Sequence, residues 1–233
     1  MNVIITGASR GFGNAIAHVF AQNGHNLVLT SRNEVALYNA VQEFMTVYPA
    51  ITVKAKAFDI SIKEQAQAFG QWVLGLKLPV DVLVNNAGLF DPGSVYNEAE
   101  GTLEHMMAVN LYSAYHVTRS VIDHMIAQKS GHIFNMCSIA SFKAYANGGA
   151  YSISKYALAG FSTNLREEMK PFGIKVTTVY PGAAMTDSWA GSGVDPKRIM
   201  EASDIAKMIY AAAQLSPQAC VEEIILRPQL GDL

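Results

Sequence analysis

The chain opens with Asn2-Val-Ile-Ile-Thr6-Gly7-Ala8-Ser9-Arg10-Gly11-Phe12-Gly13-Asn14-Ala15-Ile16. A short apolar, β-branched run is followed by a glycine-rich turn, and an amphipathic helical pattern then continues to Gly24. Strand, turn and helix in this order predict a nucleotide site. Glycines let the backbone approach a pyrophosphate, and a helix N-terminus offers unpaired N–H groups. The spacing is T-G-x-x-x-G-x-G, which differs from the common G-x-G-x-x-G.

Strand-like and helical patterns alternate through the rest of the chain. We expect strands at 2–6, 26–30, 51–57, 80–84, 131–136, 174–179 and 221–226. We expect helices near 12–23, 34–47, 62–76, 98–108, 109–128, 150–170 and 203–214. Apolar strands separated by helices predict a parallel sheet covered on both faces, and the right-handed crossover rule favours a doubly wound α/β arrangement. No internal repeat or Pro/Ser-rich linker interrupts the sequence, so residues 1–233 are expected to form one domain.

The composition limits the classes of partner. Half of the 233 residues are hydrophobic, 15% are charged, and the net charge is −2, which argues against nucleic acid or an anionic membrane as the main partner. Because the first strand begins at residue 2 and no apolar run reaches ~18 residues, we expect a cytoplasmic protein without a membrane span. The two cysteines and six histidines show no metal-ligand spacing, so no metal is predicted.

A second informative segment runs from Ser138 to Lys155. Tyr151 and Lys155 are four residues apart, so on a helix they share one face. A lysine ammonium beside a phenol is expected to lower the phenol pKa from about 10 and so provide an acid or base near neutral pH. Ser138 follows a strand-like run and can bring a hydroxyl to the same point. These groups can protonate a carbonyl oxygen or deprotonate an alcohol.

Together, the two segments resemble the classical short-chain dehydrogenase/reductase family over nearly the whole chain. The elements that carry the resemblance are Thr6-Gly7-x-x-x-Gly11-x-Gly13, Asn85-Asn86-Ala87-Gly88, Asn110, Ser138, Tyr151-x-x-x-Lys155 and Pro181-Gly182. The resemblance implies a Rossmann fold with a seven-stranded parallel sheet in the order 3-2-1-4-5-6-7. It also implies that Tyr151 is the proton donor or base, that Lys155 lowers its pKa and holds ribose hydroxyls, that Ser138 polarises the carbonyl, and that Asn110 holds a water next to Lys155.

The residues after the second expected strand favour NADP(H) over NAD(H). The sequence there is Thr30-Ser31-Arg32-Asn33, without the carboxylate that would bind the ribose 2′-hydroxyl, and Arg10 adds a second cation in the glycine turn. Asp59 is expected near the adenine, although it can equally cap the following helix. The expected coenzyme contacts are Gly7, Ser9, Arg10, Gly11, Phe12, Gly13, Ser31, Arg32, Asp59, Ile60, Asn86, Ala87, Gly88, Tyr151, Lys155, Pro181, Gly182, Ala184 and Thr186.

The substrate is less clearly indicated. Residues 185–200 lack periodicity and are interpreted as a lid over the substrate. Aromatic and apolar side chains in the surrounding loops suggest a flat or apolar carbonyl compound such as a pterin, an aryl ketone or a small dicarbonyl, although each of them could equally be ordinary loop packing. The expected substrate contacts are Ser138, Phe90, Phe142, Tyr145, Met185 and Trp189.

Three hypotheses about function stay open. The ending Val221-Glu-Glu-Ile-Ile-Leu-Arg-Pro228 resembles that of bacterial sepiapterin-reductase-like members. A 3-oxoacyl-[acyl-carrier-protein] reductase is the alternative, although the sequence has few cations to bind an acidic carrier. A non-catalytic NADP-sensing regulator is the third. The resemblance also implies a homodimer or homotetramer formed through the helices near 109–128 and 150–170, where Val117, Val121, Met125, Phe161 and Leu165 could serve the core, the dimer contact or both.

Overall fold

The architecture was obtained as a computed structural model, which describes residues 1–186 and 193–232. Seven parallel strands form the main sheet in the order β3-β2-β1-β4-β5-β6-β9, as predicted. Their bounds are β1 Asn2–Thr6, β2 Asn26–Thr30, β3 Val53–Ala55, β4 Val82–Asn85, β5 Gly131–Met136, β6 Ile174–Pro181 and β9 Glu223–Leu226. The order reverses between β1 and β4, which places a crevice at the carboxyl ends of these two strands.

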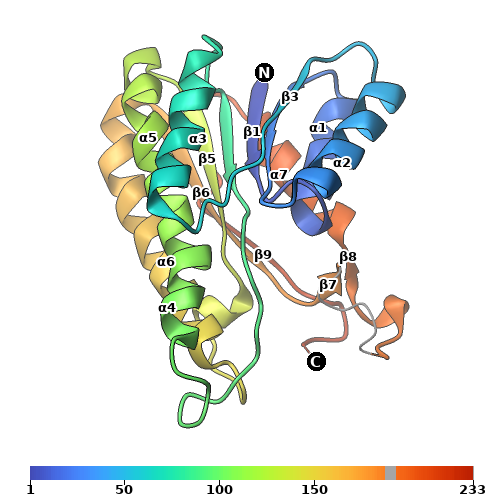
Figure 1. Ribbon diagram of the computed structural model, residues 1–233, viewed down its shortest axis with the longest axis vertical. Coiled ribbons are helices and arrows are strands. Elements are labelled where there is room, and N and C mark those ends of the chain that lie inside the picture. Colours follow the sequence, from blue (N-terminus) through green and yellow to red (C-terminus); the bar gives the residue numbers. More distant parts are fainter. Residues whose placement is uncertain (187–192, 233) are drawn as a thin grey trace.

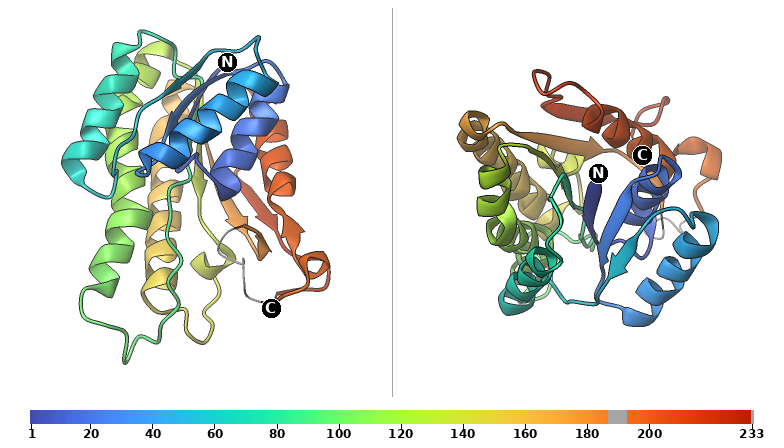
Figure 2. Two further views of the ribbon diagram at one scale, coloured as in Figure 1. Left: turned by 45° about the vertical axis from the view of Figure 1, so that its right-hand side comes forward. Right: turned by 90° about the horizontal axis from the view of Figure 1, so that it is seen from above.

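Helices cover both faces of the sheet (Figure 1, Figure 2). One face carries α1 Gly11–Gln22, α2 Glu34–Val47 and α7 Ala202–Ala213, and the other carries α3 Lys63–Gly75, α5 Ser113–Gln128 and α6 Gly149–Met169. The short helix α4 Thr102–Met107 packs against α6. The inner strands are therefore buried on both sides, which explains why β1, β4 and β5 read as nearly continuous apolar runs, whereas the edge strands β3 and β9 are partly exposed.

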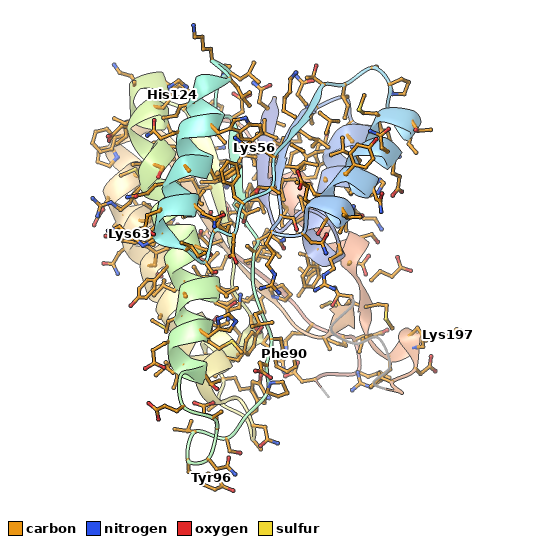
Figure 3. The ribbon with its side chains drawn as sticks, in the orientation of Figure 1. Lys56, Lys63, Phe90, Tyr96, His124 and Lys197 are labelled. Atoms are coloured by element: carbon orange, nitrogen blue, oxygen red, sulfur yellow. The ribbon has the colours of Figure 1, made fainter. Side chains whose placement is uncertain are left out.

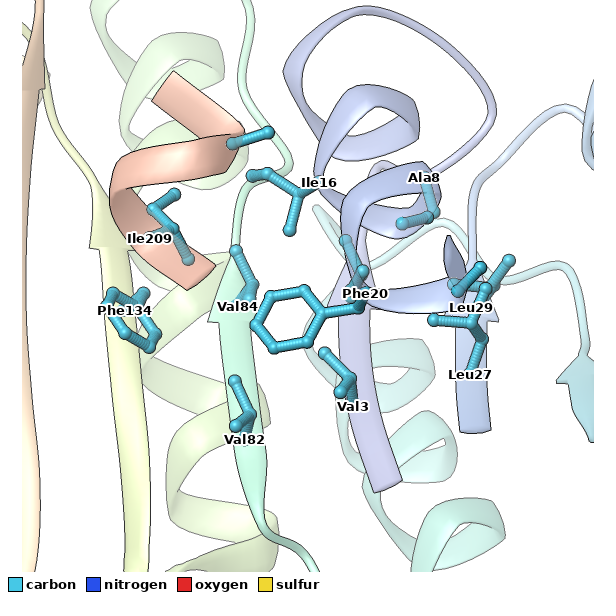
Figure 4. Close-up of a cluster of buried hydrophobic side chains, with 14 of the residues drawn as sticks. Val3, Ala8, Ile16, Phe20, Leu27, Leu29, Val82, Val84, Phe134 and Ile209 are labelled. Carbon is cyan, nitrogen blue, oxygen red and sulfur yellow. The ribbon is translucent and has the colours of Figure 1, made fainter. Parts of the chain in front are cut away.

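The core on the α1 side is built around Phe20, whose side chain is fully buried (Figure 4). Ile16 on the same helix and Ile209 of α7 also belong to this cluster, together with Val3 and Val84 of the sheet. The buried residues of α1, including Ile16, Ala17 and Phe20, recur every three to four residues, so one stripe of the helix faces the strands. Burial of a side chain the size of Phe20 contributes roughly 2–3 kcal/mol to folding, and it fixes α1 above the β1–β4 crevice.

The structure corrects several predicted boundaries. The expected strand 51–57 shortens to β3 Val53–Ala55, and a π-helical turn, η1 Ala108–Tyr112, joins α4 and α5 into a continuous helical stretch. A separate pair of two-residue strands, β7 Ala184–Met185 and β8 Met200–Glu201, brackets the segment predicted as a lid. Strands this short leave no period-two pattern, so the sequence could not predict them. Much of that segment, including Trp189, lies outside the described residues.

The apolar positions considered for a dimer contact mostly belong to the core of this chain. Val117, Val121, Met125 and Leu165 are buried between α3, α5, α6 and the sheet, and Phe161 packs partly against them. A dimer contact would therefore have to use other side chains of α5 and α6. Across the described ranges, no helix is long and apolar enough to cross a membrane.

Candidate active site

The glycine turn after β1 is shaped by close backbone contacts. Gly7 has a φ of +64°, and a Cβ there would lie 2.9 Å from the Cα of Ala87. A Cβ at Gly13 would lie 2.4 Å from the carbonyl oxygen of Gly7. Only glycine fits both positions, because real Cβ atoms do not approach so closely. The turn can therefore fold tightly between β1 and α1 and leave its outer side open to a ligand.

Thr6 and Asn86 bind the turn to the end of β4. The Thr6 hydroxyl accepts hydrogen bonds from the backbone N–H groups of Asn86 and Ala87, both at 3.0 Å. In return, the Asn86 amide donates to the carbonyls of Thr6 at 2.9 Å and Gly7 at 3.1 Å. These bonds satisfy backbone groups that the bend removes from the sheet, so Asn86 shapes the crevice from behind.

The N-terminus of α1 faces the crevice as a donor group. Arg10 occupies the N-cap position and makes no side-chain cap hydrogen bond within the described residues, and the first turn contains no acidic side chain. The early N–H groups and the positive end of the helix dipole therefore favour an anion.

Arg32, two residues after the end of β2, lines the same cleft with an exposed side chain. The next residue, Asn33, caps α2 by accepting a 2.9 Å bond from the Ala36 N–H. The Ser31 hydroxyl lies 2.9 Å from that of Ser9.

One cleft of about 420 Å³ joins the glycine turn to Tyr151 and Lys155. Its walls include sixteen of the residues predicted to contact the coenzyme and one predicted to contact the substrate: Gly7, Ser9, Arg10, Gly11, Phe12, Ser31, Arg32, Asp59, Ile60, Asn86, Ala87, Gly88, Tyr151, Lys155, Pro181, Thr186 and Phe90. The two sequence segments that suggested a nucleotide site and a proton-transfer site thus border one continuous space.

Tyr151 and Lys155 project from the first two turns of α6 toward the carboxyl end of β5. The Lys155 Nζ lies 5.9 Å from the centre of the Tyr151 ring. It donates a 2.7 Å hydrogen bond to the carbonyl oxygen of Met136, the last residue of β5. Gly88 lies beside this arrangement: a Cβ there would be in ordinary contact with the Lys155 Nζ at 3.5 Å and in slightly tight contact with the Asn110 Oδ1 at 3.3 Å.

The pKa of Tyr151 differs from the sequence-based expectation. Burial raises the pKa of the Tyr151 phenol to about 12, and a hydrogen bond with Ser138 opposes that rise. Burial also lowers the pKa of Lys155 to about 8. Desolvation is the largest influence on the phenol pKa, and Ser138, not Lys155, is the group that lowers it, so the expected effect of Lys155 is not met. At neutral pH Tyr151 keeps its proton and Lys155 is largely charged.

Ser138 and Asn110 are buried, and neither is among the described residues that line the cleft. The Ser138 hydroxyl accepts a 3.1 Å bond from Ala140 N–H and so caps the short 3₁₀ turn η2 Ile139–Ser141. The fully buried Asn110 holds Leu89: its Oδ1 accepts from Leu89 N–H at 2.7 Å, and its amide donates to the Leu89 carbonyl at 3.0 Å. The π-helical turn η1 carries Asn110, and such turns occur frequently at functional sites.

The predicted substrate residues surround Tyr151 unevenly. The Phe90 ring meets the Tyr151 ring edge-on, with centroids 4.8 Å apart. Phe142 packs edge-on against Tyr180 at 5.2 Å, and nearly half of its surface is exposed. Tyr145 is also exposed and contributes to the electrostatic environment of Tyr151. Phe90 therefore contacts the candidate proton donor directly, whereas Phe142 packs against Tyr180 and Tyr145 acts on Tyr151 electrostatically.

Other predicted contacts serve the backbone or the neighbouring strands. Gly13 packs against Gly7, Gly182 N–H donates to the Leu226 carbonyl at 2.7 Å, and Ala184 and Met185 belong to β7. The Asp59 carboxylate accepts from the Ser61 N–H at 3.1 Å and the Ser61 hydroxyl at 2.5 Å, so it closes the turn before α3. The N-cap of α3 is Ile62 and has no side-chain cap, so the alternative prediction that Asp59 caps this helix was wrong.

The sequence reasoning missed seven residues of the cleft wall. Most of them end a strand or adjoin a predicted contact, and that position was their only signal: Thr30, Phe58, Ser61, Leu89, Val109, Met136 and Cys137. Burial raises the pKa of the Cys137 thiol to about 12, so it stays protonated. In the two described ranges, no group of His, Cys, Asp or Glu side chains could hold a metal ion.

Comparison with known proteins places this site in context. A family profile described as short chain dehydrogenase matches residues 1–196. An uncharacterized oxidoreductase of Staphylococcus saprophyticus is 32% identical over 239 residues, which cover 97% of this chain and 96% of that protein. A metagenomic short-chain oxidoreductase, solved in complex with NADP, shows 32% identity and a TM-score of 0.85 over 98% of this chain and 97% of that one. An alcohol dehydrogenase from the archaeon Thermococcus sibiricus, complexed with 5-hydroxy-NADP, shows 28% identity and a TM-score of 0.89 over 98% and 96%.

Proposed function

The chain belongs to the short-chain dehydrogenase family, and on this basis we propose that it is an NADP(H)-dependent oxidoreductase that interconverts a small carbonyl compound and its alcohol. The observation that carries the proposal is the single cleft lined by both the Gly7–Phe12 turn and the Tyr151–Lys155 pair. A dinucleotide held by the turn would extend along this cleft toward the proton-transfer pair. Neither half of the site alone would support a redox reaction.

The residues present fit NADP(H). The α1 N-terminus and the turn would hold the pyrophosphate, while Lys155 would hold ribose hydroxyls. Arg32 and Arg10 line the cleft beside the turns after β2 and β1, where the adenosine would lie, and the turn after β2 has no carboxylate. A guanidinium suits a phosphate dianion, so these side chains favour the 2′-phosphate of NADP over the free hydroxyl of NAD.

We propose that the protein's own groups move one proton and stabilise one charge. The hydride is supplied by the nicotinamide of the coenzyme when it is bound. Tyr151, protonated at neutral pH because burial raises its pKa to about 12, donates to the carbonyl oxygen as negative charge develops there. Lys155 stabilises the resulting phenolate, and its bond to Met136 keeps the ammonium in place. Ser138 orients the phenol through their hydrogen bond.

The finer assignments belong to the same proposal. Phe90 beside Tyr151, with Tyr145 and Phe142 further out, supports a flat or apolar carbonyl substrate, and a pterin or a small diketone is a specific version of it. Residues 185–200 are proposed as the substrate lid. We also propose a cytoplasmic homodimer or homotetramer with contacts on the exposed sides of α5 and α6, where Tyr112 at the start of α5 and Ile153 and Tyr156 on α6 are exposed.

A coenzyme titration combined with a carbonyl panel tests the proposal. The purified protein is titrated with NADPH and with NADH, and NADPH oxidation is then followed with sepiapterin, diketones, aryl aldehydes and acetoacetyl thioesters. We expect NADPH to bind at least about tenfold more tightly than NADH, since a charged hydrogen bond contributes about 1.5–3 kcal/mol, and we expect turnover of at least one carbonyl. Equal affinity would contradict the NADP assignment. Tight NADPH binding without any turnover would favour the regulator hypothesis.

A further inference from the structure

Two loops meet beside the beginning of α6. Residues 86–101 connect β4 to α4, and residues 142–148 connect η2 to α6. Both loops extend beyond the lower ends of α4 and α6 (Figure 1), and Tyr96 marks the lower part of the first loop, whereas Phe90 lies higher, beside α4 (Figure 3). The Gly93 N–H donates to the Asn147 carbonyl at 3.1 Å, and the Ser94 hydroxyl donates to the Asn147 Oδ1 at 2.7 Å. The two loops are therefore hydrogen-bonded to each other.

Helix α6 has no N-terminal cap from its own sequence. Gly148 occupies the N-cap position, where no side chain can accept a hydrogen bond, and the first turn contains no acidic residue. The acceptor comes from the other loop: the Glu98 Oε2 accepts from the Ala150 N–H at 3.1 Å, across 52 residues of sequence. A carboxylate at this end of a helix satisfies an otherwise unpaired donor and interacts favourably with the helix dipole.

Gly149 shows how closely the loops and the helix fit together. Its φ is +39°, and a Cβ there would lie 2.3 Å from the Gly93 carbonyl oxygen and 2.5 Å from the Glu98 Oε2. A side chain at this position would push away both the Gly93 carbonyl and the Glu98 carboxylate. The first turn of α6 and residues 93–98 therefore form one closely packed unit.

This unit is adjacent to the candidate proton donor. Tyr151 directly follows Ala150, so it lies in the turn that Glu98 caps. The same loop contributes Phe90, which packs edge-on against the Tyr151 ring, and Leu89, which Asn110 holds at both backbone groups. The loop is therefore held at one end by Asn110 and near its other end by α6.

We propose that Glu98 is a positioning residue of the active site. By capping α6 from a distant loop, its carboxylate fixes the first turn that carries Tyr151 and keeps Phe90 against the phenol ring. Glu98 does not contact the reacting atoms, and it acts through Ala150 and the loop. The inference rests on the proposed function in one respect, namely that Tyr151 is the proton donor.

The test compares Glu98→Ala with Glu98→Gln, which keeps an acceptor oxygen, and with Glu100→Ala, which removes an exposed carboxylate from the same loop. Hydrogen exchange of the amides in residues 149–152 is measured in each variant, together with kcat and KM for NADPH using 4-nitrobenzaldehyde as the probe carbonyl. For Glu98→Ala we expect exchange at residues 149–152 to be faster and kcat to be lower, each by on the order of tenfold, the range of a lost helix cap, with the KM for NADPH unchanged. Glu98→Gln should restore most of the slow exchange and most of kcat, and Glu100→Ala should behave like the original protein.

Three results would overturn the inference. The first is exchange in Glu98→Ala that matches Glu100→Ala. The second is faster exchange spread evenly over α5 and α6, which would indicate a general loss of stability. The third is faster exchange at 149–152 with unchanged kcat. Lack of turnover by the unmodified protein would instead count against the proposed function, while the exchange pattern would still decide whether Glu98 fixes the turn that carries Tyr151.

Discussion

Replacing Lys155 by Met should stabilise the coenzyme-free protein while abolishing its activity. Lys155 has a relative solvent exposure of only 5%, and this burial lowers its pKa from 10.5 to about 8. At about 1.4 kcal/mol for each pKa unit, the buried ammonium costs roughly 3 kcal/mol at pH 7. Met has a similar volume but cannot donate to the Met136 carbonyl, and the lost hydrogen bond of a charged donor offsets about 2 kcal/mol. The expected net gain is about 1 kcal/mol, or roughly 2–4 °C in Tm.

The pH dependence of this gain has a definite sign. Because the folded pKa of Lys155 lies below its unfolded value, the unfolded chain binds more protons between about pH 8 and 10.5. The cost of the buried charge is complete below about pH 8 and disappears as the pH rises through this window, so the advantage of Lys155→Met should shrink there.

Urea unfolding at pH 7.0 and 9.5, at one protein concentration, measures the change, with Lys63→Met on the exposed side of α3 as the control. A variant less stable than the original protein at pH 7, or a difference that does not change with pH, would refute the reasoning.

Three further substitutions test other parts of the site. Tyr151→Phe should abolish turnover but leave the Kd for NADPH nearly unchanged, because only the proton donor is lost; substantial remaining NADPH oxidation would remove Tyr151 from its role. Arg32→Asp should raise the KM for NADPH at least about tenfold, since a charged hydrogen bond to phosphate is lost and a repulsive charge is gained; steady-state kinetics with unchanged KM would contradict this. Gly13→Ala should lower stability by about 1–3 kcal/mol and weaken NADPH binding, because its Cβ would lie 2.4 Å from the Gly7 carbonyl oxygen; thermal unfolding at the original Tm would count against the contact.

The sequence was most informative where function depends on local spacing. The Gly7-to-Gly13 turn and the Tyr151–Lys155 pair each lie within one strand–turn–helix or one helix face, so their geometry follows from residue order. The confirmed strand order rests on the family resemblance, supported by the alternation of apolar strands and helices. The roles of the individual site residues remain proposals.

The sequence was least informative where a property depends on burial or on distant partners. Desolvation raises the pKa of Tyr151, and its extent depends on how deeply the folded chain buries the phenol. Glu98 caps a helix 52 residues away, and no local motif announces that contact. Asn110 binds both backbone groups of Leu89, a contact between η1 and a distant loop, while its expected role in holding a water stays a prediction. Such contacts are set by tertiary packing and leave little trace in local sequence patterns.

A crystal structure of the protein with bound NADP⁺ tests the central claim most directly. The account predicts that the nicotinamide lies beside Tyr151, with the phenol oxygen within about 4 Å of the position that a substrate carbonyl oxygen would occupy over the ring. It also predicts that the 2′-phosphate of the adenosine lies against Arg32. A coenzyme bound elsewhere, or bound in the cleft with the Tyr151 and Lys155 side chains directed away from the nicotinamide, would contradict it.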